Sequence, residues 1–518
     1  MWVYPEISTL GDYPSYWARH DPSRPAFKTV DRIVDFATFD KDCNRSAHFL
    51  VDRGASVGGL IGFFGKNSLD FYLAFFGSVR TGAGMVVLNW RLSAAELAMQ
   101  IADCESQLVF VERELLELWG AATAKLPSPP QIILIDENDT FEAMISDQPE
   151  NAPDITVSEA NTAFQLYTSG TTGRPKGVML AHHGTNMMRL CEHLEPAYEW
   201  HRDDSFVNAL PNFHLLHLGI TLQCLYNGVS VTIVRQFDPA SVLATISNLH
   251  PTLLTLTPTM LQMLLDHPDA GKSDFSSLRL TLYAGSAISL GLIKRAIAAM
   301  PCKFMQFYGS TESGGASSIL RPEEHDLNNE AKLQSCGRPL PLVEFRIVNP
   351  EGDEVAEGQP GELLIRQPSI TKGYWHQPET TAAVIEHGWY RSGDIVRRDE
   401  EGLYYIVDRA KDMIVSGGEN IYSAEIENVL STHPDVAAVA VIGVPDERWG
   451  EAVKAIVIPK GESANAEDLL AHCRQSLASY KVPKSLDFVA EFPLVPSGKV
   501  SKKDLRAPYW GKESRSIA

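Results

Sequence analysis

The sequence predicts an α/β fold: a large N-terminal domain of mostly parallel sheets flanked by helices, a small antiparallel subdomain, and a small α+β domain at the C-terminus. The prediction depends on three observations: the length of 518 residues, an alternation of short apolar runs with longer amphipathic ones, and a change of pattern after about residue 335. A chain this long exceeds one ordinary hydrophobic core, so two or more domains are expected. Strands that alternate with helices form crossover units, which place the strands largely parallel.

The alternation of strands and helices starts at residues 60–64, a short apolar run typical of a buried strand. Ser68 then opens a helix whose apolar side chains lie on one face. Further strands are expected at 84–88, 108–111, 132–135, 229–234, 253–256 and 280–284, and further helices at 93–102, 239–249 and 290–299.

The chain after about residue 335 is richer in glycine and proline, and its strands become short, as at 343–348 and 361–365. This pattern predicts the antiparallel subdomain. A last unit of about 100 residues, a reasonable size for a small domain, is expected to begin at Lys411, which gives domains at 1–410 and 411–518. Its expected elements are helices that start at Ser423 and Ala466, and strands at 436–442, 452–458 and 485–489.

A stretch rich in glycine and hydroxyl residues occupies positions 167–178 and reads Y-T-S-G-T-T-G-R-P-K-G-V. Glycine weakens helices and strands and Pro175 lacks a backbone donor, so the stretch is expected to be a loop after a strand at 163–167. Its N–H groups, its hydroxyls and the ammonium of Lys176 suit a polyphosphate. The alternative is a flexible linker, but linkers rarely carry a lysine between proline and glycine. A Walker loop is excluded, because Lys176 precedes glycine rather than Ser or Thr.

The composition narrows the classes of function. A net charge of −20 argues against a nucleic-acid binder, which needs clustered Lys and Arg. The seven cysteines are scattered without a C-x-x-C pair, which favours reduced thiols in a cytosol over a disulfide framework or a zinc site. Neither a signal peptide nor an apolar run of membrane-spanning length is recognised, so a cytoplasmic location without a transmembrane segment is expected.

Six other stretches are polar or rich in glycine at positions where a core would be apolar. They are 211–214 (P-N-F-H), 284–287 (A-G-S-A), 306–312 (Q-F-Y-G-S-T-E), 390–394 (Y-R-S-G-D), 408–412 with 416–420 (D-R-A-K-D and S-G-G-E-N), and 496–499 (P-S-G-K). Two of them follow predicted parallel strands, whose carboxyl ends are the usual place for ligands in such sheets. Each stretch alone could be an ordinary turn, and the charged one at 408–412 could be a solvated linker.

Together these stretches resemble the adenylate-forming superfamily, which comprises acyl-CoA synthetases, beetle luciferase and nonribosomal-peptide adenylation domains. Y-T-S-G-T-T-G-R-P-K-G-V resembles its phosphate loop, Y-G-S-T-E its nucleotide and magnesium motif, Y-R-S-G-D its ribose motif, and P-S-G-K its C-terminal lysine motif. Gly373, Tyr374, Pro378 and Thr381 also fit its G-Y-x-x-x-P-x-x-T spacing. The motifs occur in the family's order over roughly residues 30–505, and the chain is most similar to bacterial medium-chain, long-chain or aryl acyl-CoA synthetases.

The resemblance implies a two-step reaction with ATP, Mg²⁺ and coenzyme A. A carboxylate attacks the α-phosphate of ATP, which gives an acyl-adenylate and pyrophosphate. A thiol, usually that of coenzyme A, then displaces AMP and forms a thioester. Such chemistry depends mainly on positioning and charge neutralisation.

The resemblance also implies roles for individual residues in the nucleotide site. The loop would hold the β- and γ-phosphates through Thr168, Ser169, Gly170, Thr171, Thr172, Gly173 and Lys176. The rest of the nucleotide would be bound by Gly285, Ser286, Ala287, Gln306, Phe307, Tyr308, Gly309, Thr311, Asp394 and Arg409, with Tyr308 stacked on adenine and with Asp394 and Arg409 at the ribose. Glu312 would hold Mg²⁺.

The remaining implied roles concern catalysis, domain movement and the acid. Lys499 would stabilise the transition state of the first step. The small, mobile C-terminal domain would then rotate about a hinge at Lys411, which would withdraw Lys499 from the active site. The same rotation would bring Gly417 and Gly418 to the pantetheine tunnel.

His214 would lie beside the acyl pocket, together with Gly285, Gly314 and Gly315. The small residues at 313–316 leave volume there, so an acid larger than acetate or propionate is expected.

Asn212, His217 and Ser423 depart from the family's commonest pattern, which puts the identity of the acid in doubt more than the reaction. Two alternatives stay open: an acyl-AMP ligase that loads a carrier protein in trans, and a nucleotide-binding regulator without catalysis. Retention of Glu312 and Lys499 argues against the regulator, and a luciferase-like oxygenase receives little weight. The expected partners are the carboxylic acid, ATP and coenzyme A, with a carrier protein or a second copy of the chain (a homodimer) as further candidates, and no nucleic acid.

Overall fold

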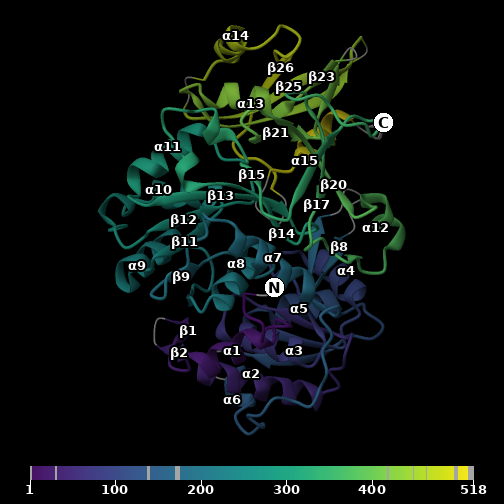
Figure 1. Cartoon of the computed structure of the whole chain (residues 1–518). Coiled ribbons are helices and arrows are strands. Elements are labelled where there is room, and N and C mark those ends of the chain that lie inside the picture. Colours follow the sequence, from purple (N-terminus) through teal and green to yellow (C-terminus); the bar gives the residue numbers. More distant parts are fainter. Residues whose placement is uncertain are drawn as a thin grey trace.

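The computed structural model describes residues 3–29, 32–136, 140–169, 175–416, 419–446, 448–461, 464–494 and 500–510. It has the predicted α/β architecture, with two large sheets, a smaller antiparallel sheet and a C-terminal α+β unit at one end of the molecule (Figure 1). In the described part of the chain, no helix combines the length and the apolar character that crossing a membrane requires.

The first large sheet has nine strands in the order β15-β14-β13-β12-β11-β9-β10-β1-β2. Neighbours from β13 to β1 run parallel, and the strands at both edges are antiparallel. The strands are β1 (Pro25–Lys28), β2 (Ile33–Asp35), β9 (Ser205–Asn208), β10 (Ser230–Ile233), β11 (Leu253–Leu256), β12 (Leu280–Tyr283), β13 (Lys303–Ser310), β14 (Gly315–Leu320) and β15 (Arg338–Pro339).

The second large sheet has seven strands in the order β18-β8-β7-β4-β3-β5-β6 and is parallel from β7 to β6. The strands are β3 (Leu60–Phe64), β4 (Gly84–Val87), β5 (Leu108–Glu112), β6 (Gln131–Ile135), β7 (Thr162–Ser169), β8 (Pro175–Ala181) and β18 (Gly373–Tyr374). The helices of the N-terminal part are α1 (Asp12–His20), α2 (Phe36–Val51), α3 (Leu69–Arg80), α4 (Ala94–Cys104), α5 (Leu116–Thr123), α6 (Phe141–Met144), α7 (His182–Leu194), α8 (Leu215–Tyr226), α9 (Pro239–Leu249), α10 (Pro258–Asp266) and α11 (Leu290–Ala299).

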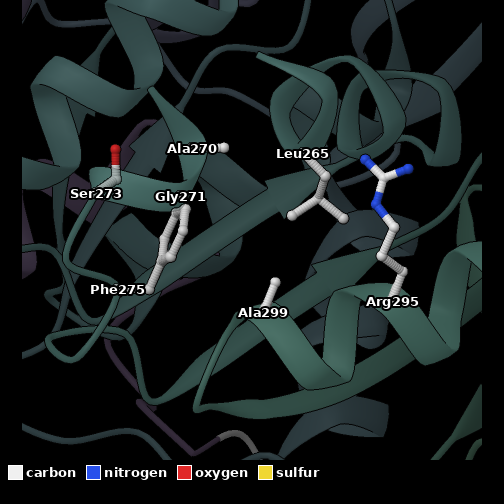
Figure 2. A pocket seen from close by; sticks show the side chains of 7 residues that line it. All are labelled: Leu265, Ala270, Gly271, Ser273, Phe275, Arg295 and Ala299. Carbon is white, nitrogen blue, oxygen red and sulfur yellow. The ribbon is translucent and has the colours of Figure 1, made fainter. Parts of the chain in front are cut away.

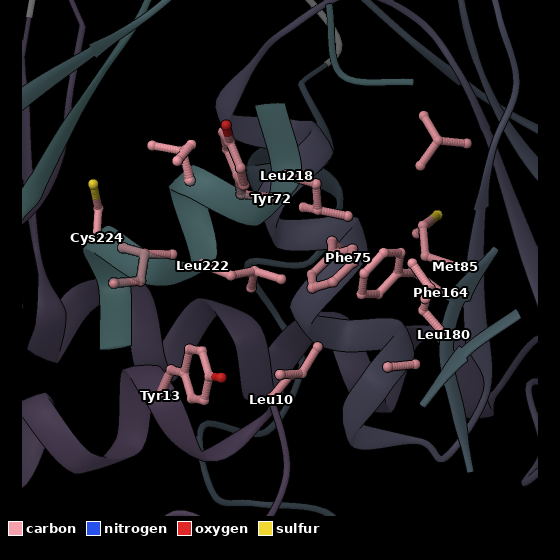
Figure 3. Packing of buried hydrophobic residues seen from close by; sticks show 14 of the residues in the cluster. Leu10, Tyr13, Tyr72, Phe75, Met85, Phe164, Leu180, Leu218, Leu222 and Cys224 are labelled. Carbon is pink, nitrogen blue, oxygen red and sulfur yellow. The ribbon is translucent and has the colours of Figure 1, made fainter. Parts of the chain in front are cut away.

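The main hydrophobic core lies between the two large sheets and contains α3 and α8 (Figure 3). Both helices are apolar around most of their circumference, as expected of helices packed on all sides. On the outer faces, α9, α10 and α11 cover the first sheet, and α4 and α5 cover the second. The layers therefore alternate helix, sheet, helix, sheet and helix.

The remaining sheets are smaller. The antiparallel subdomain contains β16 (Glu344–Val348), β17 (Gly361–Arg366), β19 (Ile385–Glu386), β20 (Trp389–Arg398) and β21 (Tyr404–Arg409), with α12 (Pro378–Val384) beside it. The C-terminal unit contains β22 (Ile414–Ser416), β23 (Glu419–Ile421), β24 (Val436–Asp446), β25 (Gly450–Pro459) and β26 (Ser485–Phe488), with α13 (Ser423–Ser431), α14 (Ala466–Ser476) and α15 (Lys502–Trp510). A core of its own lies between this sheet and α13 and α14.

One expectation about local structure was wrong. Residues 167–178 are not all loop, because 167–169 end β7 and 175–178 begin β8, and the two strands pair antiparallel in a hairpin. Gly177 fits the strand because a Cβ there would lie 2.3 Å from Nε2 of Gln165, so any other residue would require this buried side chain to move. Pro175 stands at the first position of its strand, where the missing donor costs little.

Candidate active site

The carboxyl ends of four parallel strands meet at one edge of the first large sheet. β9, β11, β12 and β13 run in the same direction and are hydrogen-bonded neighbours. They deliver the stretches 211–214, 257–258, 284–287 and 309–312 to this edge. Gly285 leaves β12 with φ +94, a conformation that favours glycine, and residues 285–287 are exposed there. The predicted nucleotide motifs are thus adjacent, at the edge where open α/β sheets bind ligands.

Glu312 lies at the point where the two large sheets come together. Its Oε1 accepts hydrogen bonds from the hydroxyls of Thr168 and Tyr374, each at 3.2 Å. Thr168 pairs with Lys176 across the hairpin, and the Lys176 ammonium lies 4.8 Å from the ring centroid of Tyr374. A carboxylate, a hydroxyl and an ammonium from three distant segments therefore converge at the base of the predicted phosphate loop.

This arrangement fits Mg²⁺ bound to ATP better than a metal held by the protein alone. Among the described residues, no group of three or more His, Cys, Asp and Glu could hold a metal ion. Mg²⁺ commonly takes one or two carboxylates and completes its shell with water and substrate phosphates. Glu312, half-buried and with one oxygen already accepting two hydrogen bonds, can supply such a carboxylate. The loop residues Gly170, Thr171, Thr172 and Gly173 lie outside the described residues, as does the side chain of Ser169.

Tyr374 was not assigned a role from the sequence, although the G-Y-x-x-x-P-x-x-T spacing marked its position. Pro378 begins α12, and Thr381 on that helix accepts the Tyr374 N–H at 2.9 Å. Gly373 has φ +125, and a Cβ there would lie 2.6 Å from Thr381 Cγ2. Burial and the nearby Glu312 carboxylate raise the pKa of Tyr374, so its hydroxyl remains a donor. The motif therefore holds a tyrosine against the predicted metal ligand.

A second polar group joins the first sheet to the antiparallel subdomain. The Tyr308 hydroxyl donates to Asp394 Oδ2 at 2.6 Å, and Arg409 opposes Asp394 in the register of β20 and β21. Arg409 Nε lies 2.6 Å from Asp394 Oδ1, but this oxygen, although buried, accepts no directed hydrogen bond. Burial and the charges of Glu312 and Asp394 raise the pKa of Tyr390, which lies between the two groups. A buried acceptor with spare capacity beside a guanidinium suits a sugar hydroxyl.

Two side chains that were predicted to bind the nucleotide, those of Phe307 and Gln306, make contacts with other side chains of the protein. The ring of Phe307 stacks on Tyr198 at 5.7 Å with an interplanar angle of 8°, within the main core. The side chain of Gln306 is buried, and its Oε1 accepts from the Tyr283 hydroxyl at 3.4 Å. Their side chains therefore pack inside the sheet layer, whereas Gly309 and Thr311, further along the same stretch, are exposed or half-buried.

His214 is positioned by contacts between the two sheets. It follows β9 and caps α8, half-buried, with its ring 4.5 Å from that of Phe213. Asn212 next to it is fully buried, donates Nδ2 to Gly65 O at 2.9 Å, and donates its N–H to Asn67 Oδ1 at 3.1 Å. These bonds connect the carboxyl end of β3 to that of β9.

Asn212 and His217, two of the residues that depart from the family's commonest pattern, are both buried in the packing below His214. His217 has no exposed surface, donates Nδ1–H to Leu210 O at 2.6 Å, and accepts from the Tyr72 hydroxyl at 2.8 Å. Burial lowers its pKa to about 3, so the ring is neutral.

Gly314 and Gly315, which were predicted to line the acyl pocket, present only backbone atoms. Gly314 has φ +79, and a Cβ there would lie 1.9 Å from Ser369 O, so no side chain fits. Gly315 has φ +142 and faces Met188 of α7. His214, just before α8, and Gly219 on that helix are partly exposed. A Cβ on Gly219 would meet only Leu215, at 3.9 Å, so there is open space beside this helix.

The segment around the predicted hinge is held by a buried carboxylate. Lys411 is exposed, between β21 and β22. Asp408, near the end of β21, accepts the N–H of Ser423 and its hydroxyl, the latter at 2.9 Å. Lys502 of α15 donates Nζ to Ser423 Oγ at 2.6 Å. A proline at 423 could not donate this N–H. Gly417, Gly418 and Lys499 lie outside the described residues.

A separate pocket of about 250 Å³ lies near the amino ends of β12 and β13, away from these groups (Figure 2). Its lining residues are Leu265, Ala270, Gly271, Ser273, Phe275, Arg295 and Ala299. They include one charged side chain and one hydroxyl, which gives the pocket little means for chemistry.

Comparisons with known proteins agree with this geometry. The AMP-binding enzyme family matches residues 15–375, and the AMP-binding enzyme C-terminal domain matches residues 425–499. The chain is 35% identical to the fatty acid–[acyl-carrier-protein] ligase ScoC of Streptomyces coeruleorubidus over 99% of both chains. It is 36% identical to a feruloyl-CoA synthase of Amycolatopsis sp over 96% of this chain and 99% of the relative. The structure of ATP-bound MatB from Rhodopseudomonas palustris superposes with a TM-score of 0.87 at 28% identity, over 97% of this chain and 99% of that one.

Proposed function

Because the chain belongs to the AMP-binding enzyme family of adenylate-forming ligases, we propose that it is an acyl-CoA synthetase that activates a carboxylic acid larger than propionate. The family and the ATP-bound relative support ATP as the nucleotide. Members of this family are AMP-forming ligases, and we propose coenzyme A as the thiol acceptor of this chain.

The observation that carries the proposal is the convergence of Thr168, Lys176 and Tyr374 on Glu312. These residues come from the hairpin β7–β8, from β18 and from the turn after β13. A triphosphate needs a cation, an ammonium and hydroxyl donors in one place, because its reaction depends on neutralising charge as the α-phosphate is attacked.

In the proposed first step, a carboxylate oxygen of the acid forms a bond to the α-phosphorus and pyrophosphate leaves. Glu312 would hold Mg²⁺, which supplies charge neutralisation at the phosphates when it is bound. Lys176 and the loop after Thr168 would bind the outer phosphates, and Asp394 with Arg409 would orient the ribose. Lys499 would stabilise the charge that develops in this step.

In the proposed second step, the thiol sulfur attacks the acyl carbonyl carbon and AMP leaves with the bridging oxygen. Between the two steps, rotation about Lys411 would move Lys499 out of the active site and bring the turn at Gly417 and Gly418 into it. Hydrogen bonds from Ser423 to Asp408 and from Lys502 to Ser423 support an ordered structure around Lys411 rather than a flexible linker. The division into domains 1–410 and 411–518 is part of the same proposal.

A carrier protein is the alternative acceptor, because one relative of nearly full length is a fatty acid–[acyl-carrier-protein] ligase. The other relative reported above is a CoA synthase of similar identity and coverage, so the acceptor has to be measured.

The test is pyrophosphate release over a panel of aliphatic and aryl acids, with and without coenzyme A, followed by mass spectrometry of the product. Acyl-CoA that forms only with ATP, Mg²⁺ and acid supports the proposal. Acyl-AMP that accumulates while coenzyme A stays unreacted would contradict the choice of acceptor. Absence of pyrophosphate release with every acid would contradict the ligase itself.

A further inference from the structure

A partly exposed face of α8 leads inward from His214. His214, Leu215 and Gly219 are all partly accessible, although most of the helix is buried. At 1.5 Å per residue, Gly219 lies about 7 Å further along the helix axis than His214, and Gln223 about 13 Å further. Leu215, Gly219 and Gln223 are spaced four residues apart and therefore share one side of the helix.

A buried polar cluster lies at the inner end of this face. Arg189 of α7 donates Nη1–H to Gly219 O at 3.0 Å and pairs with Glu192 at 2.7 Å. The amide of Gln223 is close enough to the Glu192 carboxylate and the Tyr198 hydroxyl to influence the pKa of both. Tyr198 in turn stacks on Phe307 of β13, one residue before Tyr308. The cluster therefore lies between α7, α8 and the sheet that carries the nucleotide site.

This cluster keeps several hydrogen-bonding atoms without a directed protein partner. They are Arg189 Nε, Glu192 Oε2, and both Oε1 and Nε2 of Gln223, whose amide lies near Glu192 and Tyr198 but makes no hydrogen bond of good geometry to either. These three residues are at most 4% exposed. The strand β14, which packs on both α7 and α8, has another buried atom without a partner, Ser317 Oγ.

Such a concentration of unsatisfied groups is costly for a cluster that serves only the fold. Native proteins pair the great majority of their buried polar atoms, and an exception is explained by strain, by a water or ion, or by a bound ligand. Apolar residues of similar size would pack there at no polar cost. The cluster also carries no net charge when Arg189 and Glu192 are both ionised, as their ion pair favours. A site of this kind suits a neutral group that both donates and accepts hydrogen bonds.

We propose that the acid activated by this chain carries a neutral hydrogen-bonding group, such as a hydroxyl, phenol or carboxamide, at the end distant from its carboxylate. That group would be bound by Gln223 together with the Arg189–Glu192 pair, while the carboxylate lies beyond His214 at the nucleotide. This inference rests on the proposed function, since it uses the same acyl site.

The test compares matched acids in the pyrophosphate-release assay: cinnamate with para-hydroxycinnamate, cinnamate with para-carboxamidocinnamate, and octanoate with omega-hydroxyoctanoate. The unmodified enzyme should favour a polar member by at least about tenfold in kcat/KM, because a site that pairs with a hydroxyl rejects the analogue without it. In Gln223→Leu the same ratio should fall toward one. This replacement removes an unsatisfied buried amide, so the protein is expected to fold.

Gln100→Leu is the matched control, because Gln100 is another buried glutamine, on α4. It should leave the ratio of polar to apolar acid unchanged. If the unmodified enzyme releases pyrophosphate but prefers the apolar member of every pair, the inference fails and the proposed function stands. The inference also fails if Gln223→Leu keeps the full ratio, since the cluster then holds only water. If no acid of either kind is activated, the proposed function fails with it.

Discussion

Gly219→Leu tests where the acyl chain lies. Gly219 stands inside α8, where a Cβ would meet only Leu215 Cδ1 at 3.9 Å. A leucine side chain at this position would extend into the open space beside the helix, about 7 Å along the axis from His214. The long acid should then lose binding space, whereas a short acid that ends before Gly219 should keep it.

Gly219→Leu should have two effects of opposite sign, one on the stability of the protein and one on kcat/KM for long acids, and the two can be measured separately. Glycine in a helix interior is destabilising by about 0.5–1 kcal/mol relative to good helix formers, so the variant should be as stable as the parent or slightly more stable. For the substrate, each methylene that no longer fits costs about 1–3 kcal/mol, or roughly 5- to 150-fold in kcat/KM. Gly315 is a poorer place for the same test, because its φ of +142 strains any side chain before the pocket is narrowed.

The assay measures kcat/KM for a series of straight-chain acids by pyrophosphate release, alongside the KM for ATP and the thermal midpoint. We expect the preferred chain length to shorten while the KM for ATP stays nearly the same. Gly120→Leu is the control, since Gly120 is an exposed helix glycine of α5 with open space around it. Unchanged chain-length preference in a folded Gly219→Leu protein would refute the placement of the acyl chain along α8.

The remaining predictions concern catalysis, domain movement and pH. Lys499→Ala should abolish adenylate formation yet keep most of the conversion of supplied acyl-adenylate to thioester; equal loss of both steps, measured separately, would contradict its role. Lys411→Pro should preserve adenylation and abolish overall thioester formation, because proline fixes φ and blocks rotation; normal turnover would place the hinge elsewhere. Burial lowers the pKa of three neutral histidines, His182 to about 4, His217 to about 3 and His325 to about 4. Since these folded-state values lie below the unfolded value of about 6.5, stability is present above pH 6.5 and is lost as pH falls, by about 2–3 kcal/mol for each histidine at pH 4.5. Urea unfolding above pH 6.5 and at pH 4.5 measures this loss of stability, and the same urea midpoint at both pH values would contradict the lowered histidine pKa values.

Most of the architecture was predictable because it depends on local patterns. The helices 239–249 and 290–299 and the strand 253–256 have the expected bounds, since each helix combines a clear apolar period with a capping residue at its start and the strand is a short buried apolar run. Ser68 and Ser93 cap their helices as expected. The helix Phe36–Val51 was not recognised, although Asp35 caps it.

The hairpin at Gly177 could not be predicted, because its glycine is required by a neighbour across the sheet. Local sequence patterns treat glycine and proline as loop formers, whereas here Gly177 makes room for Gln165. The bonds from Ser423 to Asp408 also join residues that the chain pattern does not relate, 15 positions apart.

The order of the nucleotide motifs was visible in the sequence, but their contacts were not. Glu312 and Thr168 are 144 positions apart, and Tyr374 reaches Glu312 from another strand. The polar cluster of Arg189, Glu192 and Gln223 gave no signal, because single polar residues in helices usually indicate a solvated face. Only the packing of α7 on α8 and β14 shows that they are buried.

The central claim is that the acid attacks the α-phosphate of ATP, and isotope transfer tests it most directly. A substrate acid labelled with oxygen-18 in its carboxylate is incubated with the enzyme, ATP, Mg²⁺ and coenzyme A, and the nucleotide product is analysed by mass spectrometry. We predict AMP that carries one heavy oxygen, because the bridging oxygen of the acyl-adenylate leaves with AMP when the thiol attacks. Unlabelled AMP, or label found in phosphate with ADP as the nucleotide product, would contradict the adenylate-forming mechanism.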